Sequence, residues 1–206
     1  MGEGWGEGQT ERGTKFEFDS APNKLPVMDW SLRLACEGDI PELEMLIERS
    51  VRELQATHYT TGQMDGALGS VFGVDRQLIR DYFVAEQEGA IIACGGWSKR
   101  ESLFGSDAPR ERKRALLEPP IQPARIRAFF VHPQHARRGL GHAILPACEE
   151  AMRHARFRTI TLVATLPGVA FYEAFGYKSG QGYEVQLGNG LSLPVVPMSR
   201  TLTLHR

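Results

Sequence analysis

The chain has 206 residues, a formal net charge of −1 and 42% hydrophobic residues, which suits one domain burying roughly two-thirds of its unfolded surface. This near-neutral balance argues against nucleic acid or a charged membrane as partner. No apolar run reaches the roughly 18 residues of a membrane span, and no apolar secretory segment opens the chain, so a cytoplasmic location is expected. Three separated cysteines are expected to be reduced core residues. No metal site is expected, because the histidines lack companion ligands.

Residues 1–27 are rich in Gly, Glu and Thr and are predicted to form a flexible tail, because they cannot bury enough apolar surface to become ordered. A single domain is expected over residues 28–206. Alternating apolar residues predict a strand at 30–34. An amphipathic helix then follows Asp39-Ile40-Pro41-Glu42, which has the pattern of a capping box. A second, shorter helical region is predicted to begin at His58.

Residues 98–123 form a long segment, rich in Arg, Lys and Pro, that has no clean periodicity. They are interpreted as a solvated basic insertion or, alternatively, as a lid over an acceptor site, which would favour an acceptor carrying a carboxylate or phosphate.

The other predicted elements are a hairpin of strands 82–86 and 90–97 turning at Glu88-Gly89, a strand at 125–131, a helix from 139 to about 155, a strand at 159–164, a short helix stopped by Gly176, and a C-terminal hairpin over 183–202.

The stretch from Phe129 to His142 places an apolar strand directly before a basic, glycine-containing turn and a helix. Such a turn aims backbone N–H groups, at the positive end of a helix dipole, at an anion. Gly139 and Gly141 have no Cβ, so a ligand can approach the main chain closely. A P-loop is excluded because no Gly-Lys-Ser/Thr follows Gly141, and a dinucleotide fingerprint because Ile144 stands where Gly or Ala is needed. The turn is interpreted as a phosphate cradle, with a plain tight turn as the alternative.

A second motif, Phe171-Tyr172-Glu173-Ala174-Phe175-Gly176-Tyr177, lies further along the chain on a predicted short helix. Together with the glycine turn, and in this order, it resembles the GNAT acyltransferase family. The family's pattern is Arg/Gln-x-x-Gly-x-Gly/Ala followed by Phe-Tyr-x-x-x-Gly-Phe/Tyr on a later helix. The resemblance covers residues 32–202. It implies an α/β (α+β) GNAT fold: a mixed, mostly antiparallel, splayed sheet of six to seven strands flanked by about four helices.

The resemblance also implies an N-acetyltransferase that uses acetyl-CoA and a primary amine of a small molecule or peptide as acceptor. Tyr172 is then the expected general acid to the CoA thiolate, since a tyrosine hydroxyl is a suitable donor; its alternative role is core packing. Ala136 stands where relatives have Arg or Gln, and Thr165, assigned to the cofactor site, stands where many have Asn. The other expected acetyl-CoA contacts are Phe129, Phe130 and Val131 for the pantetheine arm, and Arg137, Arg138, Gly139, Leu140, Gly141 and His142 for the pyrophosphate.

A general base is not identified, because residues 120–147 and the predicted strand 159–164 contain no acid. His58, Tyr59, Glu184 and a water chain remain as candidates. The alternative function is a non-catalytic acyl-CoA-binding sensor or regulatory module, and a third is the same fold acting on a longer acyl chain. The protein is expected to be a monomer or a homodimer, since edge strands of the C-terminal hairpin could pair between subunits.

Overall fold

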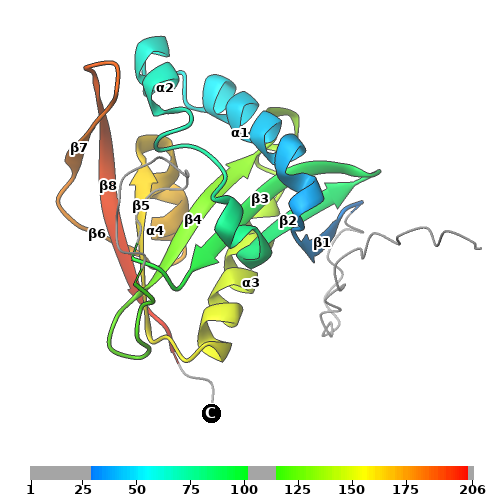
Figure 1. The fold of residues 1–206 in the computed structure, drawn as a ribbon, viewed down its shortest axis with the longest axis vertical. Helices are drawn as coiled ribbons and strands as arrows, with labels where there is room; N and C mark the ends of the chain where they lie inside the picture. Colours follow the sequence, from blue (N-terminus) through cyan, green and yellow to red (C-terminus); the bar gives the residue numbers. More distant parts are fainter. Residues whose placement is uncertain (1–28, 102–114, 204–206) are drawn as a thin grey trace, which may run out of the picture.

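The computed structural model of the chain describes residues 29–101 and 115–203 (Figure 1). The predicted tail at 1–27 and the centre of the 98–123 segment therefore lie outside the described residues. The α-helices are α1 (Ile40–Leu54), α2 (Thr61–Ala67), α3 (Leu140–His154) and α4 (Val169–Ala174). The strands are β1 (Ser31–Leu34), β2 (Tyr82–Gln87), β3 (Ala90–Ser98), β4 (Ala124–Val131), β5 (Thr159–Thr165), β6 (Lys178–Ser179), β7 (Tyr183–Gln186) and β8 (Ser192–Thr201).

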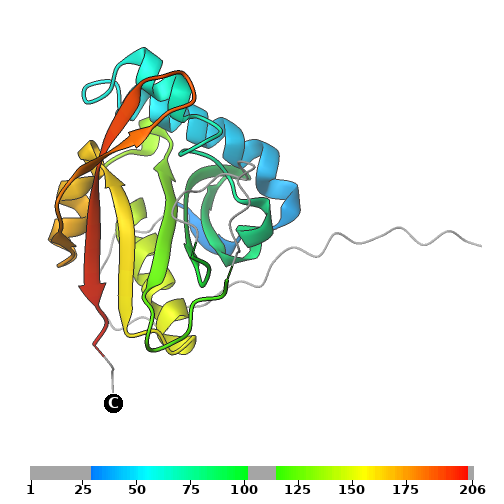
Figure 2. The same ribbon diagram turned by 60° about the vertical axis from the view of Figure 1, so that its left-hand side comes forward.

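The strands form one sheet in the order β1-β2-β3-β4-β5-β8-β6, and β7 also pairs with β8. All neighbours are antiparallel except β4 and β5, which run parallel. These two strands pair only at Ala124 with Ile160 and at Arg125 with Thr161, and beyond this point they separate (Figure 2). The expected mixed, splayed sheet is confirmed. Among the described residues the sheet has eight strands, one more than the largest number expected, because β6 with two residues is too short to leave a sequence pattern.

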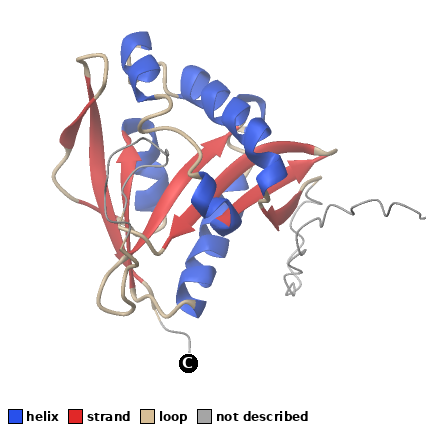
Figure 3. Ribbon diagram, in the orientation of Figure 1, coloured by secondary structure: helices blue, strands red, loops and turns tan. Residues whose placement is uncertain are grey.

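Helices cover both faces of the sheet (Figure 3). One face carries α1, α2 and the short 3₁₀ helix η2 (Arg76–Asp81), and the other carries α3 and α4. Most of the apolar face predicted for each long helix is buried in these two layers, but Leu54, also predicted to be on this face of α1, is 36% exposed. The buried side chains include Leu43, Ile47 and Val51 on α1, and Leu140, Ile144, Cys148 and Met152 on α3. Removing each such side chain from water contributes about 1.5–3 kcal/mol, so these faces fix the helices on the sheet.

Gly95 in β3 allows α3 to pack closely on the sheet. A Cβ at this position would lie 2.6 Å from the Ile144 side chain and 2.6 Å from the ring of Phe129. Because real Cβ contacts are not this short, any larger residue would displace the helix or the ring. The Phe129 ring in turn packs against Tyr172, with 6.1 Å between ring centroids. The position of Tyr172 therefore depends on the space left at Gly95.

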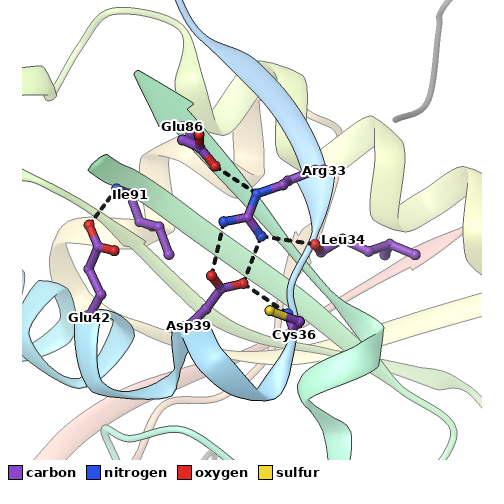
Figure 4. A network of polar contacts seen from close by, with 7 residues as sticks. All are labelled: Arg33, Leu34, Cys36, Asp39, Glu42, Glu86 and Ile91. Carbon is purple, nitrogen blue, oxygen red and sulfur yellow. Dashed lines mark hydrogen bonds and ion pairs between the residues drawn. The ribbon is translucent and has the colours of Figure 1, made fainter. Parts of the chain in front are cut away.

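The entry to α1 differs from the predicted capping box. Asp39 precedes the helix but makes no side-chain cap. Its carboxylate accepts hydrogen bonds from both terminal nitrogens of Arg33, at 2.7 and 2.9 Å, and from the N–H of Cys36 at 2.8 Å (Figure 4). Glu42 accepts a hydrogen bond from the N–H of Ile91 in β3, at 2.6 Å. Both carboxylates thus tie α1 to the sheet, through partners that only the tertiary structure brings near.

The Arg33–Asp39 pair gives the fold a pH dependence. Burial alone would raise the pKa of Asp39, but the hydrogen bonds from Arg33 and Cys36 lower it below its ordinary value of 3.8. A lowered folded-state pKa adds stability above pH 3.8, and this stability is lost as the pH falls through and below that value. We expect Asp39→Asn to lower the free energy of unfolding by about 2 kcal/mol at neutral pH, and by less near pH 3.

Urea unfolding at both pH values measures this difference. Glu44→Gln is the matched control, because Glu44 and its partner Arg76 are both more than half exposed and their pair adds little stability. An equal loss at both pH values for Asp39→Asn would contradict the role given to its charge.

Candidate active site

A cavity of about 890 Å³ opens where β4 and β5 separate. Its walls include the last turns of α1 and residues 71–73 on one face of the sheet, and the start of α3 with α4 on the other. After Arg125 and Thr161 the two strands share no register pair, so their facing edges border the cavity instead of each other. The cavity therefore connects the two helical layers through the sheet.

A bulge bends β4 in the middle of the cavity. The register between β3 and β4 shifts between Cys94 and Gly96, and Ala128, opposite this shift, has a φ of 51°. This left-handed conformation costs a non-glycine residue about 1–2 kcal/mol. The Cys94 thiol donates a weak hydrogen bond to the Ala128 carbonyl, at 3.3 Å. Bulges of this kind re-aim a strand and are frequent beside functional sites.

The turn between β4 and α3 has the geometry of an anion cradle. Arg137 and Gly139 are both left-handed, with φ values of 63° and 84°. Gly139 is the N-cap of α3, and no side chain caps this helix. Its first N–H groups, which carry the partial positive charge of the helix dipole, are therefore left for a ligand. Arg138 is exposed and lies outside the cavity lining, whereas the lining includes Arg137, Gly139, Leu140, Gly141 and His142.

The two glycines of the turn serve different purposes. At Gly139 an added Cβ would meet nothing within 4 Å, so glycine is favoured there by the left-handed φ alone. At Gly141 a Cβ would lie 3.0 Å from the ring of Phe171 in α4. The absence of a side chain at Gly141 thus makes room for the packing of α4 against α3.

Tyr172 lines the cavity with a buried ring, 7% exposed. The ring packs against Phe129, Phe171 and Tyr177, with centroid distances of 6.1, 5.0 and 5.7 Å. Its hydroxyl makes no hydrogen bond to any residue that the structure describes. Burial, with a smaller contribution from nearby Cys148, raises the pKa of Tyr172 above its ordinary value. The hydroxyl therefore stays protonated at neutral pH and is able to donate.

The remaining predicted cofactor residues, Phe129, Phe130, Val131 and Thr165, also line the cavity, on β4 and at the end of β5. The structure thus brings together residues that come from two separate sequence motifs. The end of the cavity at α1 was not predicted, and it is lined by Ser50, Leu54, Gln55, Val71, Phe72, Gly73 and Arg127. Nothing in the sequence marks Gln55, because a polar residue at a helix end is usually exposed.

The three side chains proposed as general bases lie outside the cavity lining. The Tyr59 hydroxyl donates to the carbonyl of Pro194 and accepts from the N–H of Leu166, both at 2.8 Å. It therefore connects the segment after α1 to β8 and to the end of β5. His58 and Glu184 are exposed. Within the described part of the chain, the cavity lining contains no carboxylate.

The residues that the structure describes contain no group of three or more His, Cys, Asp or Glu side chains placed to hold a metal ion. None of their helices is long and apolar enough to cross a membrane.

Residues 79–179 match the acetyltransferase (GNAT) domain family. The fold is similar to that of a GCN5-related N-acetyltransferase from Rhodopseudomonas palustris, with 18% identity, a TM-score of 0.64, and coverage of 84% of this chain and 95% of that one. It is similar to the PaiA N-acetyltransferase from Thermoplasma acidophilum in complex with coenzyme A, with 12% identity, a TM-score of 0.59, and coverage of 85% of this chain and 100% of that one. It is also similar to YncA, a putative acetyltransferase from Salmonella typhimurium with its cofactor acetyl-CoA, with 16% identity, a TM-score of 0.54, and coverage of 86% of this chain and 96% of that one. None of the curated proteins matches the sequence.

The packing of Gly141 against Phe171 leads to a testable prediction. We expect Gly141→Ala to lower the free energy of unfolding by about 1–3 kcal/mol, because the new methyl group displaces the ring. In a Phe171→Leu background the loss should shrink by about 1 kcal/mol, since the smaller side chain leaves room. Gly139→Ala, whose loss comes from backbone strain, should be unaffected by Phe171→Leu. Urea unfolding of the single and double variants measures the coupling, and additive losses at Gly141 and Phe171 would refute it.

Proposed function

Because the chain belongs to the GNAT superfamily, we propose that it transfers the acetyl group of acetyl-CoA to a primary amine, with Tyr172 as general acid. The acceptor is an amine of a small molecule or a peptide. The proposal rests mainly on one observation: a single cavity is lined by the anion cradle, by the free edges of β4 and β5, and by Tyr172.

The binding of acetyl-CoA is assigned to two parts of this cavity. The pyrophosphate would lie on the N–H groups from Arg137 to His142, where the helix dipole favours negative charge. The pantetheine arm would pair with the main chain of Phe129, Phe130 and Val131, on the edge of β4 that β5 leaves free. The similar structures with coenzyme A and acetyl-CoA support acetyl-CoA as the ligand of this cavity.

The reaction then requires one bond to form and one to break. The acceptor amine, in its neutral form, attacks the thioester carbonyl carbon, the carbon–nitrogen bond forms, and the carbon–sulfur bond breaks. The departing thiolate takes the proton of the Tyr172 hydroxyl, which is protonated at neutral pH. The nitrogen releases its proton to water, and a proton from water restores Tyr172. A water chain is assigned this second transfer because no carboxylate lines the cavity in the described residues.

The same lack of a carboxylate favours a second candidate, a sensor that binds acyl-CoA without turnover. A protein that only binds acyl-CoA releases no thiolate and would not need a general acid. Tyr172 lines the cavity, and its hydroxyl has no described hydrogen-bond partner, which counts against the sensor and for the enzyme.

We expect Tyr172→Phe to lower kcat by about 100-fold or more, which is the usual contribution of a general acid. The dissociation constant for acetyl-CoA should stay within about twofold, because the ring that packs the cavity is retained. Thiol release with a panel of amines measures kcat, and calorimetry measures binding. Tyr183→Phe is the control, since Tyr183 is 40% exposed and lies outside the cavity lining.

Three outcomes separate the readings. Loss of turnover with intact binding supports the proposed role of Tyr172. Unchanged turnover in Tyr172→Phe would keep the enzyme and remove its general acid. Acetyl-CoA binding by the wild type, with no turnover of any amine, would favour the sensor.

A further inference from the structure

The hydroxyl of Tyr59 lies at the point where the pairing of β5 with β8 ends. Thr165 and Val195 form the last register pair of these two strands. One further step would place Leu166 opposite Pro194, which has no N–H to donate. Instead, the Tyr59 hydroxyl accepts a hydrogen bond from the N–H of Leu166 and donates one to the carbonyl of Pro194, both at 2.8 Å. The hydroxyl therefore takes the place of the next bond between the strands.

The same hydroxyl caps the segment that leads to the proposed general acid. Leu166 begins the 3₁₀ helix η4 (Leu166–Gly168), which runs directly into α4 and hence to Tyr172. Thr165, the residue before η4, makes no side-chain cap. The N–H of Leu166 bonds instead to Tyr59, which stands 107 positions earlier in the chain. Because a buried N–H without a partner is costly, Tyr59 fixes the start of η4.

η4 belongs to the wall of the cavity and lies beside Tyr172. Thr165, Pro167 and Gly168 all line the cavity. A Cβ at Gly168 would lie 3.4 Å from the Thr165 hydroxyl oxygen and 3.6 Å from the ring of Tyr172. A shift of η4 would therefore move the cavity wall and the ring of the proposed acid together.

The segment that carries Tyr59 is itself held firmly. Tyr59 is 3% exposed and directly precedes the N-cap of α2. The side chain of Gln63 in α2 donates a hydrogen bond to the carbonyl of Ser192 in β8, at 2.7 Å. The side chain of Asn189, in the turn between β7 and β8, donates one to the carbonyl of Gly62 in α2, at 2.8 Å. These bonds tie α2 to the hairpin, so the Tyr59 hydroxyl is a fixed support for η4.

From these contacts we propose that Tyr59 is a positioning residue for acetyl transfer: its hydroxyl holds η4 in place and, through η4 and α4, aligns the Tyr172 hydroxyl with the departing thiolate. This inference rests on the proposed function and deepens it. Without the Tyr59 hydroxyl, the N–H of Leu166 and the carbonyl of Pro194 would lose their common partner or be drawn together into a direct bond. Either change moves η4.

The test is Tyr59→Phe, which removes the hydroxyl and keeps the ring. Its kcat should fall about tenfold, because small displacements of a reacting group are costly, while the Kd for acetyl-CoA, measured by calorimetry, stays within about twofold. Thiol release from acetyl-CoA is measured with glutamate, spermidine, 2-phenylethylamine and trialanine, and the variants are compared on the amine with the highest wild-type kcat. Tyr183→Phe, which removes an exposed hydroxyl outside the cavity lining, is the control and should leave kcat unchanged.

A double-variant cycle separates positioning from a general loss of structure. In the Tyr172→Phe background, Tyr59→Phe should lower kcat by less than about twofold, because the hydroxyl that it aligns is already absent. A fall by the same factor in both backgrounds would mean that Tyr59 is only structural, and would overturn the inference. Asp39→Asn also destabilises the protein but lies outside the cavity lining. It should leave kcat unchanged where every variant is folded, and a fall equal to that of Tyr59→Phe would count as a second refutation.

The remaining outcomes are distinct. An unchanged kcat in Tyr59→Phe, or a tenfold weaker Kd for acetyl-CoA, would overturn this inference and leave the proposed acetyl transfer standing. An unchanged kcat in Tyr172→Phe would remove the general acid and this inference with it. Release of thiol with none of the amines, by a wild-type protein that still binds acetyl-CoA, would overturn the proposed function as well.

Discussion

The short pairing between β4 and β5 decides how the sheet opens and where its helices can border a cavity. These strands are parallel neighbours joined by the α3 crossover, yet only two register pairs connect them. β5 pairs with β8 along its whole length, and β4 bends at the Ala128 bulge, so each strand follows its other partner away from the gap. The cavity, the free strand edges and the passage from one helical layer to the other all follow from this divergence.

The position of the proposed general acid is set by space that glycines leave on both sides. Gly95 admits the ring of Phe129, and Gly141 admits the ring of Phe171. Tyr172 packs against both of these rings. The Tyr172 side chain is therefore held at the cavity wall by a rigid aromatic cluster, and the burial that fixes the ring also raises the pKa of its hydroxyl.

Structural features that are determined by residues close together in the sequence could be predicted. The glycine turn, the helix after it and the left-handed stop at Gly176 depend on neighbouring residues, and the structure has them in place. The two motifs also implied the splayed sheet, through the resemblance to a family. Features that need distant partners could not be predicted. The carboxylate of Asp39 bonds to Arg33 and Cys36 instead of capping α1, and the Tyr59 hydroxyl bridges Leu166 and Pro194. Gln55 has no signal in the sequence because only folding buries it.

The facing edges of β4 and β5 are two strand edges without a strand between them, and such edges normally invite another polypeptide to pair and start aggregation. Here they face inward. α1, the segment around Phe72, α3 and α4 flank the opening on both faces of the sheet. A second protein chain that paired with either edge would have to fit its side chains between these elements, whereas a slender ligand with amide groups along its length has no such side chains to place. The flanking elements therefore hinder self-association at the place where the sheet is incomplete.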